Sequence, residues 1–303
     1  MDEIELIEQI RKHNQPLEPR KTELEPRRPE LSSIRAVVFD IYGTLLISGT
    51  GDISLACTDN HNQALLKTFE DFNVGVTVAS APFADQFTQL ILQAQESRRA
   101  DHVDYPEIDI LQVWKYLLIE AVESGWIDRY PREDERRLMA VDFECRVNPV
   151  AAMPGLEETL RALKSAGKTL GIVSNAQFFT PLLFPALLGK DLDALGFDAN
   201  CRIWSWILRE AKPSQRLYKE LARQLKDHHG IQPAEALFVG NDLRNDIAPA
   251  QACGFKTALF AGDQRSLRIR EGDPLVKDVE PDGILTDLRQ LIAQTGPLRP
   301  TEA

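Results

Sequence analysis

The stretch Arg35-Ala36-Val37-Val38-Phe39-Asp40-Ile41-Tyr42-Gly43-Thr44-Leu45 decides the fold predicted for this chain. Its apolar run ends abruptly at Asp40, and a Gly-Thr turn follows. This pattern is typical of a buried parallel strand that delivers a carboxylate to the carboxyl end of a sheet, where open α/β folds bind ligands. A carboxylate there is costly unless it is paired, bound to a metal or used in chemistry. The plainer alternative is a strand that ends in a turn-forming aspartate, but three later segments favour a functional role.

The composition is that of an ordinary globular protein. The chain has 303 residues, 43% of them hydrophobic and 27% charged, and its length predicts about two domains. Its net charge of −11 argues against a nucleic-acid surface, which usually carries a basic excess. Its N-terminal residues show no secretory signal, and no apolar run approaches the roughly 20 residues that span a membrane.

The cysteines indicate the compartment. They lie far apart and form no CxxC pair: Cys57, Cys145, Cys201 and Cys253. This spacing favours neither a zinc site nor a disulfide framework, and it fits a reducing compartment. We therefore expect a cytoplasmic protein with no membrane and no nucleic-acid partner. Nothing in the sequence specifies an oligomeric state.

Residues 1–33 form a separate N-terminal extension. One apolar face of a short helix is indicated by Ile4, Leu6, Ile7 and Ile10. Prolines and many charges then interrupt any regular element, at Pro16, Pro19, Pro26 and Pro29. We expect a solvated, flexible tail, with an arm docked on the sheet or on a partner as the alternative.

The remaining chain alternates between two kinds of apolar spacing. Helical spacing prevails over 49–148, which predicts an all-helical insertion with helices near 64–72, 83–94, 110–118 and 131–141. Strands and helices then alternate over 149–292, with strands at 169–173, 236–239 and 256–260. The βαβα order predicts a doubly wound parallel sheet over 34–48 and 149–292, of the α/β class, and a C-terminal tail over 293–303.

Polar clusters follow four predicted strand ends or adjoining loops. They are Asp40 with Thr44, Ser174 with Asn175, Lys212 with Pro213, and Asn241-Asp242 with Asp246. Parallel topology brings such ends to one edge of the sheet. A carboxylate, a hydroxyl donor, a cation and further acidic groups suit transfer of an anionic group through a covalent aspartyl intermediate.

The order of these motifs resembles the haloacid dehalogenase-like (HAD) superfamily of hydrolases. Asp-x-Tyr-Gly-Thr-Leu, Val-Ser-Asn, Ala-Lys-Pro-Ser and Val-Gly-Asn-Asp-Leu-Arg-Asn-Asp follow one another as in that family. The resemblance covers about residues 34–291, and the helical insertion lies where the family carries its C1 type of cap. It implies a Rossmann-like core and a hydrolase that acts on a small anionic substrate.

The resemblance also implies roles for individual residues. Asp40 is then the nucleophile, and Lys212 neutralises the substrate anion and positions Asp40. The implied substrate-binding residues are Gly43, Thr44, Ser174 and Asn175. The implied ligands of a Mg²⁺ ion are Asp40, the backbone carbonyl of Tyr42, and members of the group Asn241, Asp242 and Asp246. Oxygen ligands of this kind suit Mg²⁺.

Two departures from the phosphatases of the family leave the reaction open. Tyr42 stands where they carry an aspartate that protonates the leaving group, and a phenol with a pKa near 10 is a poor substitute. Asn241 stands where they carry a metal-binding aspartate. We expect a Mg²⁺-dependent phosphatase. A metal-independent 2-haloacid dehalogenase, in which tyrosine is typical at this place, and a HAD-fold binding protein with weak catalysis are the alternatives. The predicted early insertion helix, around 83–95, has no arginine to receive a halide, which disfavours the dehalogenase.

Overall fold

A six-stranded parallel sheet forms the centre of the molecule. The computed structural model describes residues 3–50 and 58–294. The strands lie in the order β5-β4-β1-β6-β7-β8, and each neighbouring pair is parallel. Their bounds are β1 (Ala36–Phe39), β4 (Thr169–Ser174), β5 (Phe197–Trp204), β6 (Ala236–Gly240), β7 (Lys256–Phe260) and β8 (Gly283–Leu285). The predicted doubly wound parallel sheet is confirmed, with β1 in its middle.

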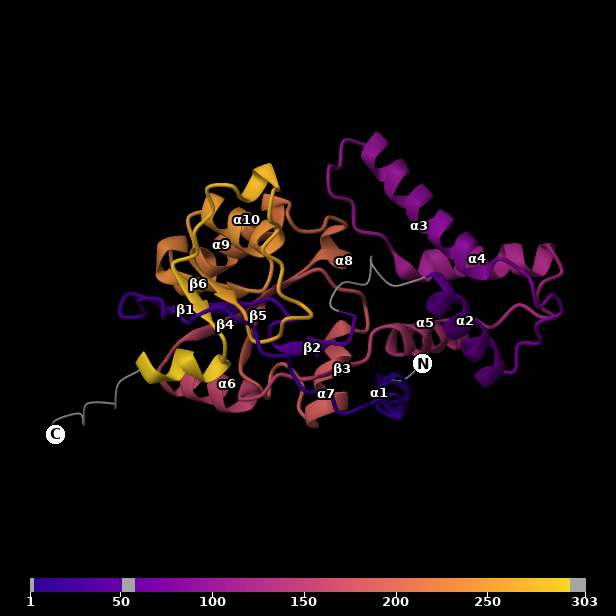
Figure 1. The fold of residues 1–303 in the computed structure, drawn as a ribbon, viewed down its shortest axis with the longest axis horizontal. Coiled ribbons are helices and arrows are strands. Elements are labelled where there is room, and N and C mark those ends of the chain that lie inside the picture. Colours follow the sequence, from indigo (N-terminus) through magenta and orange to yellow (C-terminus); the bar gives the residue numbers. More distant parts are fainter. Residues whose placement is uncertain (1–2, 51–57, 295–303) are drawn as a thin grey trace.

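Helices cover both faces of this sheet (Figure 1). Val37 and Phe39 of β1 pack toward α6 (Leu156–Ser165) and α7 (Leu183–Leu188). The alternate residues of β1, Ala36 and Val38, belong to a second core with α9 (Gln215–His229) and α10 (Ala248–Ala252). Successive strand residues point to opposite faces, so a strand buried on both sides must be apolar throughout. This is why the sequence of β1 has no polar residue before Asp40.

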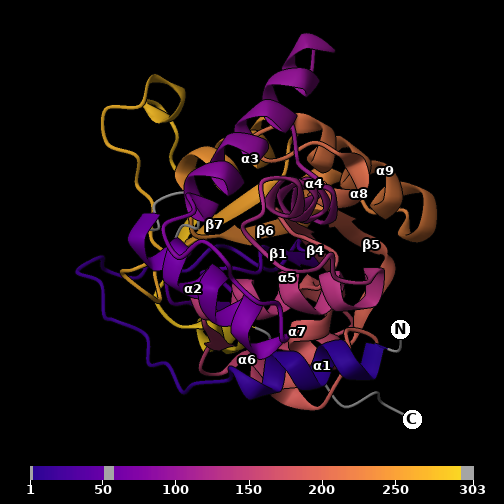
Figure 2. The ribbon, with the colours of Figure 1, turned by 90° about the vertical axis from the view of Figure 1, so that its right-hand side faces the viewer.

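Four helices lie between two short strands beside the sheet. They are α2 (Thr58–Asp71), α3 (Phe83–Ala100), α4 (Ile110–Glu123) and α5 (Glu133–Val147). The flanking strands β2 (Leu46–Ser48) and β3 (Val150–Ala152) pair in an antiparallel ribbon, so the chain leaves and re-enters the sheet layer at one place. The helices share their own apolar core, in which Phe87, Trp114 and Phe143 make edge-to-face ring contacts. Figure 2 shows α4 and α5 in front of the sheet.

The N-terminal segment is docked, which corrects the expectation of a solvated tail. Leu6 and Ile10 of α1 (Glu3–Lys12) are each 2% exposed and pack into the main core. The physical reason is the fully buried carboxylate of Asp142 on α5. It accepts hydrogen bonds from Gln9 (2.7 Å) and Arg146 (2.7 Å), and it contacts His13 Nε2 at 2.5 Å. These long-range partners cannot be read from local spacing.

Asp142 therefore connects α1 to the helices of the insertion. A further donor is the hydroxyl of Thr68 on α2, at 2.6 Å. Burial acts to raise the pKa of Asp142, but the hydrogen bonds from His13, Arg146 and Thr68 outweigh it and lower the pKa to about 2. The carboxylate therefore stays charged at neutral pH.

Shorter elements complete the chain. They are α8 (Ser205–Leu208), the 3₁₀ helices η2 (Thr180–Leu182), η3 (Pro233–Glu235), η5 (Pro274–Val276) and η6 (Leu288–Gln294), and the π-helix η4 (Leu243–Ile247). The strands β2, β3, β5 and β8 were not among those predicted. Within the ranges that the structure describes, no helix combines the length and apolarity needed to cross a bilayer.

Candidate active site

The end of β1 places Asp40 at the centre of a polar cluster. Its carboxylate is buried, and its Oδ1 atom accepts from the ammonium of Lys212 at 2.6 Å and from the hydroxyl of Ser174 at 3.0 Å. Lys212 Nζ also contacts Asp246 Oδ1 at 2.6 Å. The ends of β1 and β4 and the segments around 212 and 246 therefore meet at one edge of the sheet, as parallel topology requires.

The cation of this cluster is firmly held. Burial acts to lower the pKa of Lys212, but Asp246 and Asp40 outweigh it and hold the pKa above the ordinary value. Burial and the neighbouring carboxylates raise the pKa of Asp246. The side chain of Asn175 fixes the lysine loop, because its Oδ1 accepts from Lys212 N at 2.7 Å. The ammonium is thus positioned against Asp40 at neutral pH.

Two glycines allow the loops of this cluster to approach one another. At Gly43, with φ +84°, an added Cβ would lie 2.6 Å from Asn241 Nδ2. At Gly240, an added Cβ would lie 2.5 Å from the carboxylate of Asp246. Larger residues at either position would force the turn after β1 or the loop after β6 out of place.

The side-chain oxygens of the last motif, at Asn241, Asp242 and Asp246, already accept hydrogen bonds from other groups of the protein. Asn241 Oδ1 accepts from the hydroxyl of Thr44 at 3.2 Å, and its Nδ2 donates to Ser266 O at 2.5 Å. Asp242 begins η4, where its Oδ1 accepts from two backbone amides, and its Oδ2 contacts Arg270 Nη2 at 2.5 Å. Asp246 Oδ2 accepts from the amide of Asp242 at 3.0 Å. Arg270 was not predicted from the sequence as a member of the site.

A cavity of about 260 Å³ opens above Asp40. Of the predicted site residues, it is lined by Asp40, Tyr42, Asn175, Lys212, Asn241, Asp242 and Asp246. Gly43, Thr44 and Ser174 are not among the lining residues, because the two hydroxyls are completely buried behind the cavity and bind Asn241 and Asp40. The remaining lining is also mostly polar and includes Glu107, Glu144, Asn148, Gln177, Arg268 and Arg270.

Tyr42 cannot readily exchange protons in this setting. Burial, and next the charge of Glu144, raise the pKa of the phenol far above its ordinary value of 10. The hydroxyl shares a hydrogen bond of 3.0 Å with Thr180 Oγ1. Tyr42 therefore remains a neutral phenol tied to the core side of the cavity.

Two glutamates from the helical insertion reach the same cavity. Glu107 is held by hydrogen bonds from Ser205 (2.6 Å) and Gln177 (3.1 Å), while burial raises its pKa. Glu144 of α5 differs, because its Oε1 atom is shielded from solvent and has no hydrogen-bond partner among the described residues. Burial raises the pKa of Glu144 to about 7, although Asn148 acts in the opposite direction. No local sequence pattern marked Glu107 or Glu144 as a site residue. Glu144 lies in α5, whose sequence is that of a highly charged helix.

Comparisons with known proteins show two kinds of enzyme that the chain is similar to in sequence. The chain is 27% identical over 184 residues to phosphoglycolate phosphatase 1 of Pseudomonas aeruginosa, a match that covers 58% of this chain and 61% of that protein. It is 28% identical over 231 residues to (S)-2-haloacid dehalogenase 4A of Burkholderia cepacia, which covers 75% of this chain and 83% of that protein.

A solved structure shares the fold. The 2-haloacid dehalogenase of Pseudomonas syringae pv. Tomato superposes with a TM-score of 0.55 at 21% identity, covering 86% of this chain and 97% of that one. The family model described as haloacid dehalogenase-like hydrolase matches residues 34–254. That span contains the four motifs and the helical insertion. The chain therefore belongs to the haloacid dehalogenase-like hydrolases.

Proposed function

We propose that this protein hydrolyses a small phosphorylated metabolite through a phosphoaspartyl intermediate at Asp40. One observation carries the proposal. Asp40 Oδ1 is bound by both Lys212 and Ser174, whereas Oδ2 accepts no hydrogen bond from the described residues, and Asp40 lines a polar cavity. A carboxylate that is oriented at one oxygen and open at the other suits nucleophilic attack.

The reaction then has two balanced steps. In the first, Asp40 Oδ2 bonds to phosphorus, the ester P–O bond breaks, and the leaving oxygen takes a proton. In the second, water attacks the phosphoaspartyl phosphorus and gives a proton back to the group that protonated the leaving oxygen, which releases inorganic phosphate and restores the Asp40 carboxylate. Lys212 neutralises charge that develops near Asp40 in both steps. The helices α2–α5 would act as a cap that limits the access of bulk water to the intermediate.

Glu144 supplies the proton that Tyr42 cannot provide. Glu144 lines the cavity from α5, and its pKa of about 7 keeps it partly protonated at neutral pH. A general acid works best when its pKa lies near the operating pH. The acid would thus come from the insertion instead of from the position of Tyr42.

Fewer residues are suited to bind Mg²⁺ than the sequence implied. Asp242 and Asp246 are bound by Arg270, Lys212 and backbone amides. The groups that remain suitable are the Asp40 carboxylate, the Tyr42 carbonyl and the side-chain oxygen of Asn241, which accepts one hydrogen bond, of 3.2 Å, from Thr44. Mg²⁺ commonly binds one or two carboxylates and completes its octahedron with water and substrate phosphate, so this set fits the ion. When bound, Mg²⁺ would neutralise charge on the phosphoryl group.

The alternative of a metal-independent 2-haloacid dehalogenase is supported by the neutral Tyr42 and by the amide at Asn241. The described α3 residues do not line the cavity, so this helix offers no arginine to receive a halide there. Arg268 and Arg270, which do line it, contact backbone carbonyls and Asp242 respectively.

A substrate panel tests the proposal. Phosphate esters and 2-haloacids are assayed with Mg²⁺ and with EDTA, with Asp40→Asn as the control for contaminating activity. We expect phosphate release that depends on Mg²⁺ and is absent in the variant. Halide release by the wild type in EDTA, without phosphate release, would establish the alternative.

A further inference from the structure

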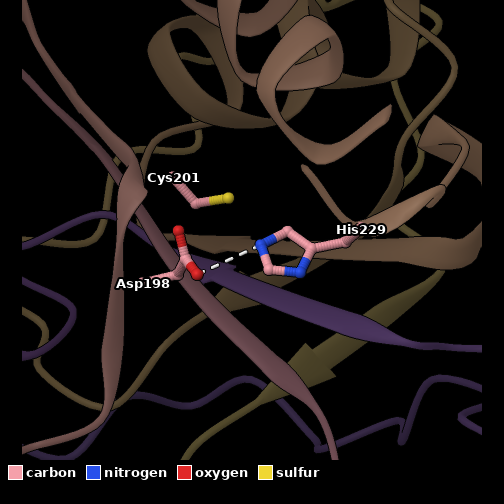
Figure 3. A group of neighbouring side chains, drawn as sticks. All are labelled: Asp198, Cys201 and His229. Atoms are coloured by element: carbon pink, nitrogen blue, oxygen red, sulfur yellow. Dashed lines mark ion pairs between the residues drawn. The ribbon is translucent and has the colours of Figure 1, made fainter. Parts of the chain in front are cut away.

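A second group of possible metal ligands lies at the outer edge of the sheet. Asp198 and Cys201 belong to the edge strand β5, and His229 is the last residue of α9. Their side chains converge in Figure 3, and their ligand atoms all lie within 4.8 Å of one another. None of the three lines the cavity above Asp40.

An irregularity in β5 brings the two strand residues together. Phe197 pairs with Leu170 and Arg202 with Ile172, so five steps along β5 match two steps along β4. In a regular strand, residues three apart point to opposite faces. The extra residues allow Asp198 and Cys201 to share one side, and bulges commonly redirect side chains in this way.

A glycine on the neighbouring strand permits this arrangement. An added Cβ at Gly171 would lie 3.0 Å from the backbone oxygen of Cys201 and 3.3 Å from its Cβ. The carboxylate of Asp198 is also oriented locally, since its Oδ1 accepts from Asn200 N at 2.9 Å. Its Oδ2 is left to face His229. The backbone thus holds two of the three donors before any ligand is present.

The separation between two of the ligand atoms is close to that in a tetrahedral site. His229 Nε2 lies 3.1 Å from Asp198 Oδ2. With zinc–nitrogen and zinc–oxygen bonds of about 2.0–2.2 Å, the corresponding edge of a tetrahedron is about 3.4 Å. The three ligand atoms, which all lie within 4.8 Å of one another, would draw together when the ion binds.

The polar atoms of the group are poorly satisfied without a ligand. His229 Nε2 is shielded from solvent and forms no well-aligned hydrogen bond with any described residue, despite its short ion-pair contact. Buried polar atoms normally have partners. Arg35, the nearby cation, donates to the backbone carbonyls of His229 and Gly230 and contacts Glu235, so its charge is directed elsewhere.

We propose that Asp198, Cys201 and His229 bind one zinc-type divalent cation. The thiolate and imidazole favour a borderline-soft ion such as Zn²⁺ over Mg²⁺. Asp198 and His229 are 27% and 26% exposed at their side chains, which provides an entry path, while Cys201 closes the site from the core. Water fills the fourth position.

Charge and protons balance at this site. Cys201 loses its thiol proton to solvent when the ion binds, and His229 binds as the neutral imidazole. The two charges of the ion then match the thiolate and the carboxylate. Because the ligand must be the thiolate, binding of the ion releases one proton and is expected to strengthen as pH rises. The bound ion would fasten the end of α9 to the edge strand.

Cobalt provides a direct probe of the proposal. The full chain is freed of metal with a chelator and titrated with Co²⁺, which gives intense visible bands in a tetrahedral site and a near-ultraviolet charge-transfer band when a thiolate binds. We expect both signals to saturate at one equivalent. Zn²⁺ should then remove them and raise the melting temperature of the protein.

Matched variants locate the signals. Cys201→Ser should abolish the charge-transfer band, and His229→Gln, at the more exposed rim, should weaken binding at least tenfold. Cys253→Ser removes a half-buried thiol elsewhere and should leave the signals intact, as should Asp40→Asn in the cavity. No thiolate band in the wild type, or an unchanged band in a folded Cys201→Ser or His229→Gln variant, would overturn the proposal.

Discussion

Glu144→Gln tests whether the insertion provides the general acid. Glutamine preserves the size of the side chain but cannot donate a carboxyl proton. A positioned general acid typically contributes about 10²–10⁴-fold, which corresponds to about 3–5 kcal/mol of the barrier. We therefore expect kcat for an alkyl phosphate to fall by that factor. An aryl phosphate should change little, because its leaving phenolate needs no proton.

The pKa of Glu144 sets the expected pH dependence. With a pKa of about 7, the carboxyl group is about nine-tenths protonated at pH 6 and about one-tenth protonated at pH 8. Only the protonated form donates, so wild-type kcat for the alkyl ester should fall about tenfold over this range. This fall should be absent in Glu144→Gln.

Steady-state kinetics on one alkyl and one aryl phosphate, at pH values between 6 and 8, measure both effects. Glu123→Gln removes an exposed carboxylate from the neighbouring helix α4 and serves as the control for a change in net charge. An equal loss of kcat for both esters, or a pH dependence that persists in Glu144→Gln, would refute the assignment of the acid.

Three further predictions concern stability and Tyr42. The pKa of Glu144 is raised from 4.5 to about 7 in the folded state, so its ionisation costs stability as pH rises through this window. In urea titrations, the free energy of unfolding of Glu144→Gln should exceed that of the wild type by up to about 3 kcal/mol at pH 8, and the two should be equal at pH 4. An equal difference at both pH values would contradict this. Asp142→Asn should lower the free energy of unfolding by about 1.5–3 kcal/mol at pH 7, because it removes the charged acceptor of Gln9 and Arg146, although Arg146 keeps its contact with Asp71, and it should expose α1 to limited proteolysis. Protection of α1 in this variant equal to that in the wild type would argue against the role of Asp142 in holding α1. Tyr42→Phe should leave the pH profile of the alkyl ester unchanged and cost about 1 kcal/mol of stability through the lost contact with Thr180, whereas a shifted profile would return Tyr42 to the mechanism.

Local sequence predicts where the central strands end. Apolar runs that stop at Asp40, Ser174 and Asn241 mark β1, β4 and β6, and parallel topology then brings their polar residues together. Apolar spacing also indicates α2–α5, because amphipathic helices carry a strong periodic signal.

Other features depend on contacts between distant segments. The docking of α1 requires Asp142, more than a hundred residues away, and the edge strand β5 is irregular, so it lacks a clear alternation. Glu144 lines the cavity because α5 packs against the other helices of the insertion and against α1. Arg270 reaches Asp242 from a loop that no motif marks. Side-chain destinations of this kind are set by tertiary packing and leave no local pattern.

The covalent intermediate at Asp40 is the central claim, and a rapid-quench experiment tests it most directly. Wild-type protein is mixed with an aryl phosphate and Mg²⁺, quenched in acid during the first turnover, digested and examined by mass spectrometry. The account predicts a phosphoryl group on Asp40 that appears before phosphate is released and is absent in Asp40→Asn. Phosphate release without a phosphorylated Asp40, or a phosphoryl group on another residue, would contradict it.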